Sequence, residues 1–258
     1  MGILNINEDS FYSGNRYTAD GELLLRAQQM IADGAAILDI GGQSTRPGSE
    51  VISADEELAR VIPAIASIHK IFPETIISVD TFYAKVAKEA VQAGASIIND
   101  ISAGSLDEEL IDTVASLNVP YILMHMQGTP QTMQNHPQYE NVCREVLDFL
   151  IQKIALLKSK GIKDIIIDPG FGFGKTATHN FTLLNNLGLF KMPGLPVLLG
   201  VSRKGFIYRT LGTDAEEALN GTTVLNTIGL INGADILRVH DVKQAAEAIR
   251  LTSAIDPC

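Results

Sequence analysis

The sequence lacks the features of several protein classes. It contains only two cysteines, Cys143 and Cys258, too few for a disulfide framework and typical of reduced thiols in a cytoplasmic protein. Its opening residues 1–6 have no basic region and are too short for a signal peptide. No apolar run approaches the roughly 20 residues of a membrane span. We therefore expect a cytoplasmic chain that is not embedded in a membrane.

Positive charge is also scarce. The chain has 20 Lys and Arg against 30 Asp and Glu, and its formal net charge is -10 at pH 7. This balance argues against sequence-independent nucleic-acid binding, which depends on Lys and Arg, but leaves room for a local cationic pocket that holds a small anion. The 258 residues are 46% hydrophobic, and no linker or low-complexity segment divides them, so we expect one domain, 1–258.

A regular alternation of short apolar runs and longer amphipathic segments is present instead. Some amphipathic segments begin with a pattern that predicts a capping box, such as Ser53 with Glu56 and Ser105 with Glu108. Several end in glycine just before the next run, as at Gly34 and Gly94, which predicts a left-handed C-terminal cap. The pattern predicts an α/β fold, a (β/α)8 TIM barrel, while a doubly wound open sheet is the alternative that the count of eight runs disfavours. The eight runs are 2–6, 36–40, 76–79, 96–99, 121–124, 165–168, 197–201 and 236–239.

The run that ends at Asp168 continues into Pro169 and a series of alternating glycines, 170–174, followed by Lys175 and Thr176. The Gly-Lys-Thr end resembles a phosphate-binding P-loop, but that motif needs glycine where Pro169 stands. The glycine spacing also misses the dinucleotide fingerprint. We therefore reject both nucleotide-binding interpretations.

Almost every apolar run ends in, or just before, a polar side chain. In a barrel all strand C-termini meet on one face, where active sites lie. One or two polar strand ends would be structural, but eight at one mouth exceed what turns require. Reading round the predicted rim gives Asn5, Asp39, Asp80, Asn99, His125, Asp168, Lys204 and His240.

Two loops near the predicted rim are cationic, one with Arg203 and Lys204 and one with Arg238 and His240. The phosphate site of such barrels is frequently built by the loops after strands seven and eight. Arg203 could equally pair with surface carboxylates. Arg238 stands inside an apolar run, where an unpaired guanidinium would be costly, so we expect a functional partner for it.

Three carboxylates stand within or at the end of apolar runs, at Asp39, Asp80 and Asp168. Buried carboxylates need donors, and a heterocycle with adjacent ring N–H and amino groups would supply two of them. Side chains of Ile101, Met124 and Phe173 could clamp such a ring, although each also fits ordinary packing. His125 could hydrogen-bond within the barrel.

At these residues the chain resembles the dihydropteroate synthases of the pterin-binding barrel family. The segment DIGGQSTRPGS, 39–49, carries a highly specific part of the resemblance. Other matching segments follow in order along nearly the whole chain: MGILNINEDSF (1–11), SVDT (78–81), IND (98–100), MHMQGTP (124–130), DPGFGFGKT (168–176), GVSRKGF (200–206) and RVHD (238–241).

The resemblance implies a transferase of folate biosynthesis that joins dihydropterin pyrophosphate to p-aminobenzoate, with bond breaking before amine attack. It implies Mg²⁺ bound through Asn5, a homodimer and binding of sulfonamides. In the catalytic set it places Asp9, Arg46, Asp80, Lys204, Arg238 and His240. In the substrate-binding set it places Ser10, Phe11, Thr45, Pro47, Asp80, Asn99, Ile101, Met124, Asp168, Phe173, Gly200, Lys204 and Arg238.

Within these sets the resemblance implies separate tasks. Asp168 would hold the pterin edge, Arg238 would stack on the ring, and Arg46 with His240 would hold the leaving anion. The two loops after the first and second strands, which contain Phe11 and Pro47, would close over the site and shape the p-aminobenzoate pocket.

The chain departs from the family pattern at a few positions. Asn7 and Glu8 stand where Thr-Pro is usual, Gln43 replaces Glu, and the family usually carries residues before the first strand. A pterin-dependent methyltransferase and a non-catalytic pterin-binding paralogue are the alternatives. The intact STRPG and SRKGF segments favour the synthase reaction over both.

Overall fold

The computed structural model describes residues 1–6, 16–43, 51–133 and 137–255, with no side-chain description for residues 16–20. Each of the eight predicted apolar runs forms a strand, although the last two strands are shorter than their runs. The strands are β1 (Gly2–Asn5), β2 (Ile37–Gly41), β3 (Ile76–Asp80), β4 (Ile97–Asp100), β5 (Tyr121–Met124), β6 (Ile165–Asp168), β7 (Leu198–Leu199) and β8 (Ile236–Leu237).

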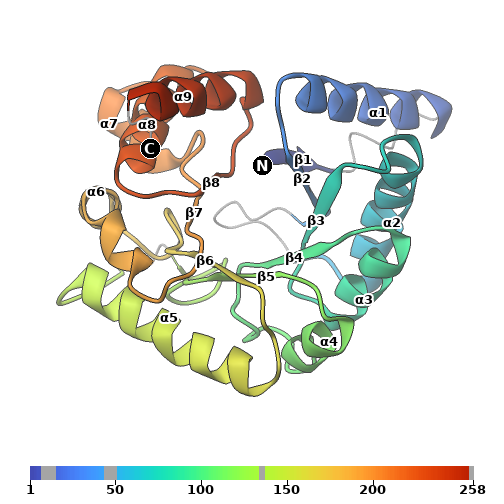
Figure 1. Ribbon diagram of the computed structural model, residues 1–258, viewed down its shortest axis with the longest axis horizontal. Helices are drawn as coiled ribbons and strands as arrows, with labels where there is room; N and C mark the ends of the chain where they lie inside the picture. The colour runs from blue at the N-terminus through green and yellow to red at the C-terminus, as the bar shows by residue number, and fades with distance from the viewer. Residues whose placement is uncertain (7–15, 44–50, 134–136, 256–258) are drawn as a thin grey trace.

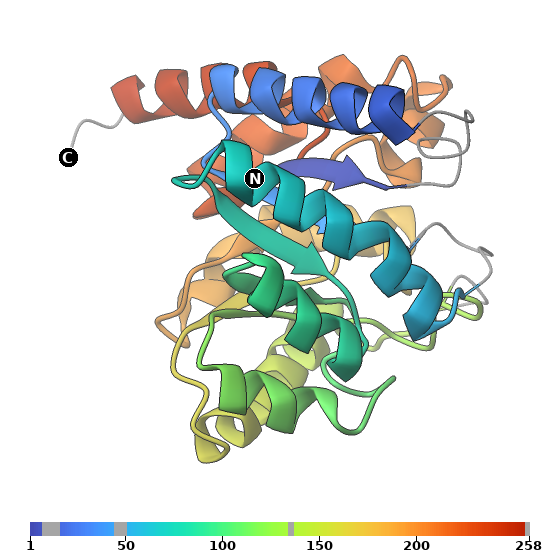
Figure 2. The same cartoon turned by 90° about the vertical axis from the view of Figure 1, so that its right-hand side faces the viewer.

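Helices follow the strands and surround them as an outer layer (Figure 1). The strands point the same way and the helices lie outside them in the side view (Figure 2). The described helices are α1 (Arg16–Ala32), α2 (Ala54–Ile71), α3 (Ala84–Ala93), α4 (Leu110–Leu117), α5 (Val142–Ser159), α6 (Ala177–Asn185), the 3-10 helix η2 (Leu187–Lys191), α7 (Gly205–Leu211), α8 (Leu219–Ile231) and α9 (Val242–Ile255).

The strands form a parallel barrel with two weak seams. β1 to β6 pair in sequence order as one sheet, and β7 pairs with β8. A parallel bridge between Ile167 and Val197 joins β6 to the β7 segment, and another between Gly2 and Val239 joins β1 to the β8 segment. Backbone hydrogen bonds reinforce the second seam, since Ile3 N donates to Val239 O at 2.9 Å. The predicted (β/α)8 barrel is confirmed.

Local sequence signals account for some helix starts and fail for others. Ser53 and Glu56 form a reciprocal capping box at α2, as predicted. The box predicted for Ser105 and Glu108 is wrong, because Ser105 Oγ donates to Ser102 O and α4 begins only at Leu110. The glycines predicted to end helices, such as Gly34 and Gly94, do take positive φ angles.

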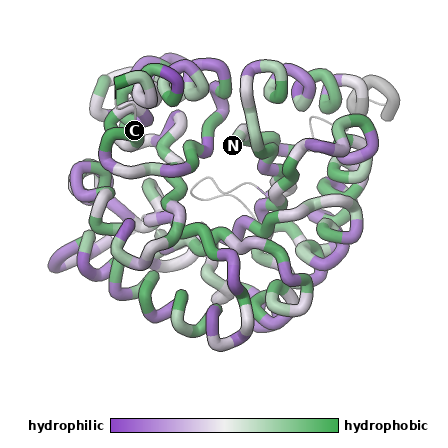
Figure 3. Tube along the Cα trace, viewed as in Figure 1, coloured by the Kyte–Doolittle hydropathy of each residue, from purple (hydrophilic) through white to green (hydrophobic). Residues whose placement is uncertain are grey.

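The core lies between the strands and the helices that cover them. Figure 3 shows hydrophobic segments concentrated along the inner ring and hydrophilic ones outside. One cluster of buried residues runs from Leu4 on β1 to Ala245 on α9, so the first and last strands share their packing. None of the helices in the described ranges is long and apolar enough to cross a membrane.

Candidate active site

The strands place two successive layers of side chains inside the barrel. Side chains two residues apart on a strand point to the same face. The lower layer is apolar and packs as one cluster that includes Ile37, Ile97, Ile122, Ile166, Leu198 and Ile236. Two residues further along the chain stand Asp39, Asn99, Met124, Asp168, Gly200 and Arg238. The alternation of side chains along the strands therefore places a mainly polar layer above the apolar one, at the C-terminal end of the barrel, which we call the mouth.

Arg238 follows β8 and reaches across the mouth to β2 and β3. Its Nε donates to Asp39 Oδ2 at 2.6 Å, and its Nη2 donates to Asp80 Oδ2 at 2.6 Å. Asn99 Nδ2 donates to the same Asp39 oxygen at 3.0 Å. The partners of this partly buried guanidinium are thus two carboxylates at the mouth, Asp39 and Asp80.

Burial and charge oppose each other in this network. Burial raises the pKa of Asp80 to about 7, against the pull of the Arg238 guanidinium. Burial lowers the pKa of Arg238, but the carboxylates of Asp39 and Asp80 outweigh it and leave the pKa above its usual range. Arg238 is therefore a permanent cation at the mouth, while the burial of Asp80 opposes its ionisation.

Asp168 ends β6 and points one oxygen at its own loop and the other at the mouth. Its Oδ1 accepts from Gly170 N at 2.7 Å. Its Oδ2 faces Gly200 and Lys204, since a Cβ on Gly200 would lie 3.8 Å from Oδ2 and 4.0 Å from Lys204 Nζ. Burial raises the pKa of Asp168, and the charge of Lys204 is the largest opposing influence. Gly200 leaves the space between these two charged groups open.

Lys204 precedes α7 and joins the β7 loop to the β6 loop. Its Nζ donates to Phe171 O and lies 4.4 Å from the centroid of the Phe173 ring. Burial lowers the pKa of Lys204 to about 8, and the Asp168 carboxylate opposes that shift. The side chain therefore combines a cation, a hydrogen bond and an aromatic contact at one point of the rim.

An apolar cluster lies beside these charges. Ile101, Met124 and Phe173, the three predicted clamp residues, pack together with Phe82 and Met133. All five side chains are buried, and we call them the apolar clamp. The arrangement offers a flat ring an apolar surface next to charged hydrogen-bonding groups.

His240 and Asn5 lie further out than the charged layer. Both are exposed, and His240 Nδ1 lies 3.0 Å from Ser202 Oγ. Arg203 is not part of this outer group, because its guanidinium donates twice to Asp241, at 2.8 Å each. Arg203 could have bound an anion or paired with a carboxylate, and in the structure it pairs with the carboxylate of Asp241.

Some predicted site residues cannot be placed. Six of them lie outside the described residues: Asp9, Ser10, Phe11, Thr45, Arg46 and Pro47. Their assigned roles stay predictions.

His125 does not line the mouth, although it ends an apolar run. It directly follows Met124, so its side chain points to the opposite face of β5. There its ring packs edge-on against Phe149 of α5, with 4.9 Å between centroids. Burial, together with the charge of Lys175, lowers the pKa of His125 to about 3, so the ring is neutral at pH 7.

Two buried charged groups, Lys175 and Glu57, are absent from the predicted site residues. Lys175 is 3% exposed and lies behind the glycine loop of β6, and Glu57 of α2 is fully buried beside Thr81. Glu57 stands on the helix stripe that faces the barrel, so a charged residue on an apolar helix face was the available signal. For Lys175 the only signal was the motif that resembles a P-loop.

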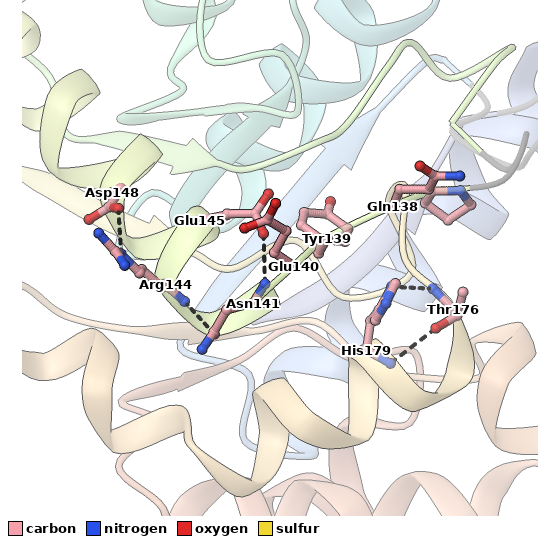
Figure 4. A pocket seen from close by; sticks show the side chains of 10 residues that line it. Gln138, Tyr139, Glu140, Asn141, Arg144, Glu145, Asp148, Thr176 and His179 are labelled. Atoms are coloured by element: carbon pink, nitrogen blue, oxygen red, sulfur yellow. Dashed lines mark hydrogen bonds and ion pairs between the residues drawn. The ribbon is translucent and has the colours of Figure 1, made fainter.

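A separate hollow of about 880 Å³ lies between α5 and α6 (Figure 4). Its polar side chains mainly satisfy one another: Arg144 pairs with Asp148, and Thr176 with His179 forms the capping box of α6. None of the predicted site residues lines it. The hollow is therefore distinct from the charged layer at the mouth.

Comparisons with known proteins agree with this geometry. A family model described as pterin binding enzyme matches residues 1–240. The chain is 43% identical to the dihydropteroate synthase of Escherichia coli (strain K12) over 256 residues, which cover 98% of this chain and 90% of that protein.

Solved structures extend the likeness to the fold. A Yersinia pestis dihydropteroate synthase with a sulfonamide drug complex matches with a TM-score of 0.93 and 38% identity, over 100% of this chain and 94% of that one. A Xanthomonas albilineans dihydropteroate synthase in complex with 7,8-dihydropteroate matches with a TM-score of 0.89 and 36% identity, over 100% and 93%. The likeness thus spans the chain in sequence and in structure.

Proposed function

Because the chain belongs to the pterin-binding enzymes, and among them to the dihydropteroate synthases, which are transferases, we propose that it makes 7,8-dihydropteroate for folate biosynthesis. Its substrates would be 6-hydroxymethyl-7,8-dihydropterin pyrophosphate and p-aminobenzoate, and pyrophosphate would leave. One observation carries the proposal: the mouth sets a buried carboxylate, Asp168, beside a cation, Lys204, and an apolar clamp.

A pterin ring matches this combination. Its amino-pyrimidinone edge carries adjacent N–H donors, and Asp168 would accept from them as a carboxylate does in a bidentate pair. Asn99, Asp80 and Lys204 would contact the remaining polar atoms of the ring. Phe173 and the rest of the apolar clamp would cover its faces. The relatives support the binding of a pterin, since a Xanthomonas protein of this family was solved with 7,8-dihydropteroate.

Magnesium fits the outer part of the mouth. Among the described residues no group of three or more His, Cys, Asp or Glu side chains could cage a metal ion. Mg²⁺ usually keeps several waters and uses one or two side chains together with substrate phosphates, so it does not need such a cage. The exposed Asn5 at the end of β1 offers one amide oxygen of the hard type that Mg²⁺ accepts. When bound there, the ion would neutralise charge on the pyrophosphate.

We propose that the carbon–oxygen bond breaks before the amine attacks. The bonding pair leaves with pyrophosphate, and the hydroxymethyl carbon becomes a cation stabilised by the ring. The carboxylates of Asp80 and Asp168, both buried at the mouth, would stabilise that positive charge. Arg46, Arg238 and His240 would stabilise the departing anion.

The amine of p-aminobenzoate then forms the new carbon–nitrogen bond and gives up a proton to solvent. This amine is neutral at pH 7, so no strong general base is assigned, and no protein nucleophile takes part. Asp9 and the other residues of the first two loops would shape the p-aminobenzoate pocket. A sulfonamide that resembles p-aminobenzoate would compete for it, as the Yersinia structure with a sulfonamide supports. Catalysis would rest on positioning and electrostatic stabilisation.

The test is direct conversion. Purified protein is mixed with dihydropterin pyrophosphate, p-aminobenzoate and Mg²⁺, and dihydropteroate and pyrophosphate are measured. Equal amounts of both products support the proposal. Pterin binding without product would instead indicate the non-catalytic paralogue, and methyl transfer from a methylated pterin to a corrinoid protein would indicate the methyltransferase.

We also propose that the working form is a cytoplasmic homodimer. Three apolar residues recur along one exposed face of α8: Val224, Ile228 and Ile231 are 48%, 39% and 70% exposed. Their spacing of three to four residues puts them on one stripe, which a second copy of the chain would cover. Light scattering of the protein and of Ile228→Glu tests this, because the substitution should yield monomers. A wild-type monomer at micromolar concentration would contradict it.

A further inference from the structure

Lys175 is a buried charged residue to which the reaction above assigns no task. It follows the glycine loop of β6, 170–174, and is 3% exposed. Its Nζ lies 2.9 Å from Gly170 O, 3.0 Å from Phe173 O and 2.9 Å from His125 Nδ1. An ammonium group has three N–H donors, and these three short contacts take all of them.

The acceptor on the histidine fits this arrangement. His125 is neutral at pH 7, and an unprotonated Nδ1 can accept from the ammonium. Burial lowers the pKa of Lys175 to about 7, while the Asp168 carboxylate opposes the shift. Burying this cation is therefore costly, and the three acceptors and the nearby carboxylate offset that cost.

The two carbonyls that Lys175 binds flank the pterin-facing part of the loop. Gly170 belongs to the turn whose N–H holds Asp168 Oδ1 at 2.7 Å. Phe173 carries the ring that packs in the apolar clamp and lies 4.4 Å from Lys204 Nζ. One nitrogen atom thus ties the backbone beside the carboxylate to the backbone beside the aromatic ring.

The glycine loop also packs against His125 at the end of β5, and Lys175 connects the loop to this residue through its contact with His125 Nδ1. A Cβ on Gly170, whose φ is +74°, would lie 1.8 Å from His125 O. Tyr139 OH donates to Gly174 O at 2.9 Å, and Gly172 N donates to Asn180 Oδ1 at 2.7 Å. The loop backbone is therefore held from several sides, with Lys175 at its centre.

We propose that Lys175 is a positioning residue that fixes the geometry between Asp168 and Phe173 and so sets the affinity for the pterin ring. The inference rests on the proposed function, since it assumes that these two residues bind a pterin. Lys175 itself touches neither substrate. Its removal should therefore weaken pterin binding while leaving the outer anion site at His240 and Asn5 unchanged.

The experiment compares two probes on variants of the whole chain. Lys175→Met keeps a long unbranched side chain but removes all three donors. Binding of 6-hydroxymethylpterin, and separately of pyrophosphate with Mg²⁺, is measured by calorimetry. We expect pterin affinity to fall about tenfold or more, because small displacements of binding groups are expensive, and pyrophosphate affinity to stay the same. In turnover, the KM for dihydropterin pyrophosphate should rise while that for p-aminobenzoate does not.

Lys153→Met is the matched control. Lys153 of α5 also donates to a loop carbonyl, Ala103 O at 2.9 Å, in the loop after β4. We expect this control to leave the binding of both probes unchanged. If Lys175→Met does not fold, Lys175→Gln, which keeps two amide donors, provides the same comparison with a smaller loss of pterin affinity.

The outcomes separate the inference from the function. Loss of pterin affinity alone supports the positioning role. Equal affinities for Lys175→Met and wild type, or equal losses for both probes, would overturn it while the proposed function stands. A wild-type protein that binds no pterin would overturn the proposed function and this inference with it.

Discussion

Replacing Asp168 by Asn keeps the oxygen that accepts from Gly170 N and removes the other oxygen as an acceptor for the pterin. Asp168 Oδ1 accepts from Gly170 N at 2.7 Å, and an amide oxygen can keep that bond. The new amide nitrogen would take the place of Oδ2, facing Lys204 and the incoming pterin donors. A charge-assisted acceptor thus becomes a donor that faces donors, at a cost of about 1.5–3 kcal/mol in pterin binding. That is a loss of about ten- to 150-fold in affinity.

The same change should not destabilise the fold. Burial raises the pKa of Asp168 above its ordinary value, so the folded state is progressively destabilised relative to the unfolded one as the pH rises from the ordinary pKa to the raised one. Asn carries no such charge. We therefore expect the melting temperature of Asp168→Asn to equal or exceed that of wild type at about pH 8, with any gain shrinking as the pH falls and wild type becomes protonated.

Asp100→Asn is the matched control, at the end of β4, which β5 separates from β6. Its Oδ1 accepts from Ser102 N, and its Oδ2 accepts from Gly104 N and Tyr121 OH, all within 2.7 Å. An amide nitrogen at either position would face an existing donor, which costs about 1–3 kcal/mol of folding free energy. We expect this variant to melt lower but to bind pterin normally. Calorimetry and thermal unfolding measure both quantities, and unchanged pterin affinity in Asp168→Asn would refute the reasoning.

The other predictions concern stability and the outer site. Burial raises the pKa of Glu57 to about 7 from 4.5. Denaturant unfolding should therefore show that Glu57→Gln gains about 2.5 kcal/mol in free energy of unfolding over wild type when the pH is raised from 5 to above 7; a constant difference would count against it. Gly170→Ala should fold poorly, because its Cβ would lie 1.8 Å from His125 O. His240→Ala should weaken pyrophosphate binding much more than pterin binding. Phe11→Ala should raise the KM for p-aminobenzoate but leave amine-independent pyrophosphate release intact.

Much of the fold follows from local patterns in the sequence. The run 165–168 joins three consecutive β-branched residues to a terminal Asp168, and it forms β6 with those bounds. The Ser53–Glu56 capping box forms as its pattern predicts, because the Ser53 hydroxyl and the Glu56 carboxylate bond within the box. The corresponding Ser105 pattern fails since Ser105 Oγ donates to Ser102 O instead. Local capping signals hold only where tertiary contacts leave their donors and acceptors available.

The sequence predicts those site residues whose inward direction follows from the alternation of side chains along a strand. Asp39, Asn99 and Asp168 lie on the inner face of buried strands, and counting by two from the apolar layer below selects them. The same count would have excluded His125, which directly follows the inward Met124. Lys175 could not be found this way, because its role depends on how a loop folds back over β5, and no periodicity describes that.

The charge balance of the mouth bears on the order of the chemical steps. Three buried carboxylates, Asp39, Asp80 and Asp168, face the cations Arg238 and Lys204, and burial lowers the pKa of Lys204 to about 8. Among the described residues, Asp39 Oδ1 is also a buried acceptor without a partner. The inner layer is therefore richer in acceptors and negative charge than in donors. Such a layer would favour a ring that brings N–H groups and then becomes cationic, and in the proposed bond-breaking-first reaction the outer residue His240 would face the departing anion.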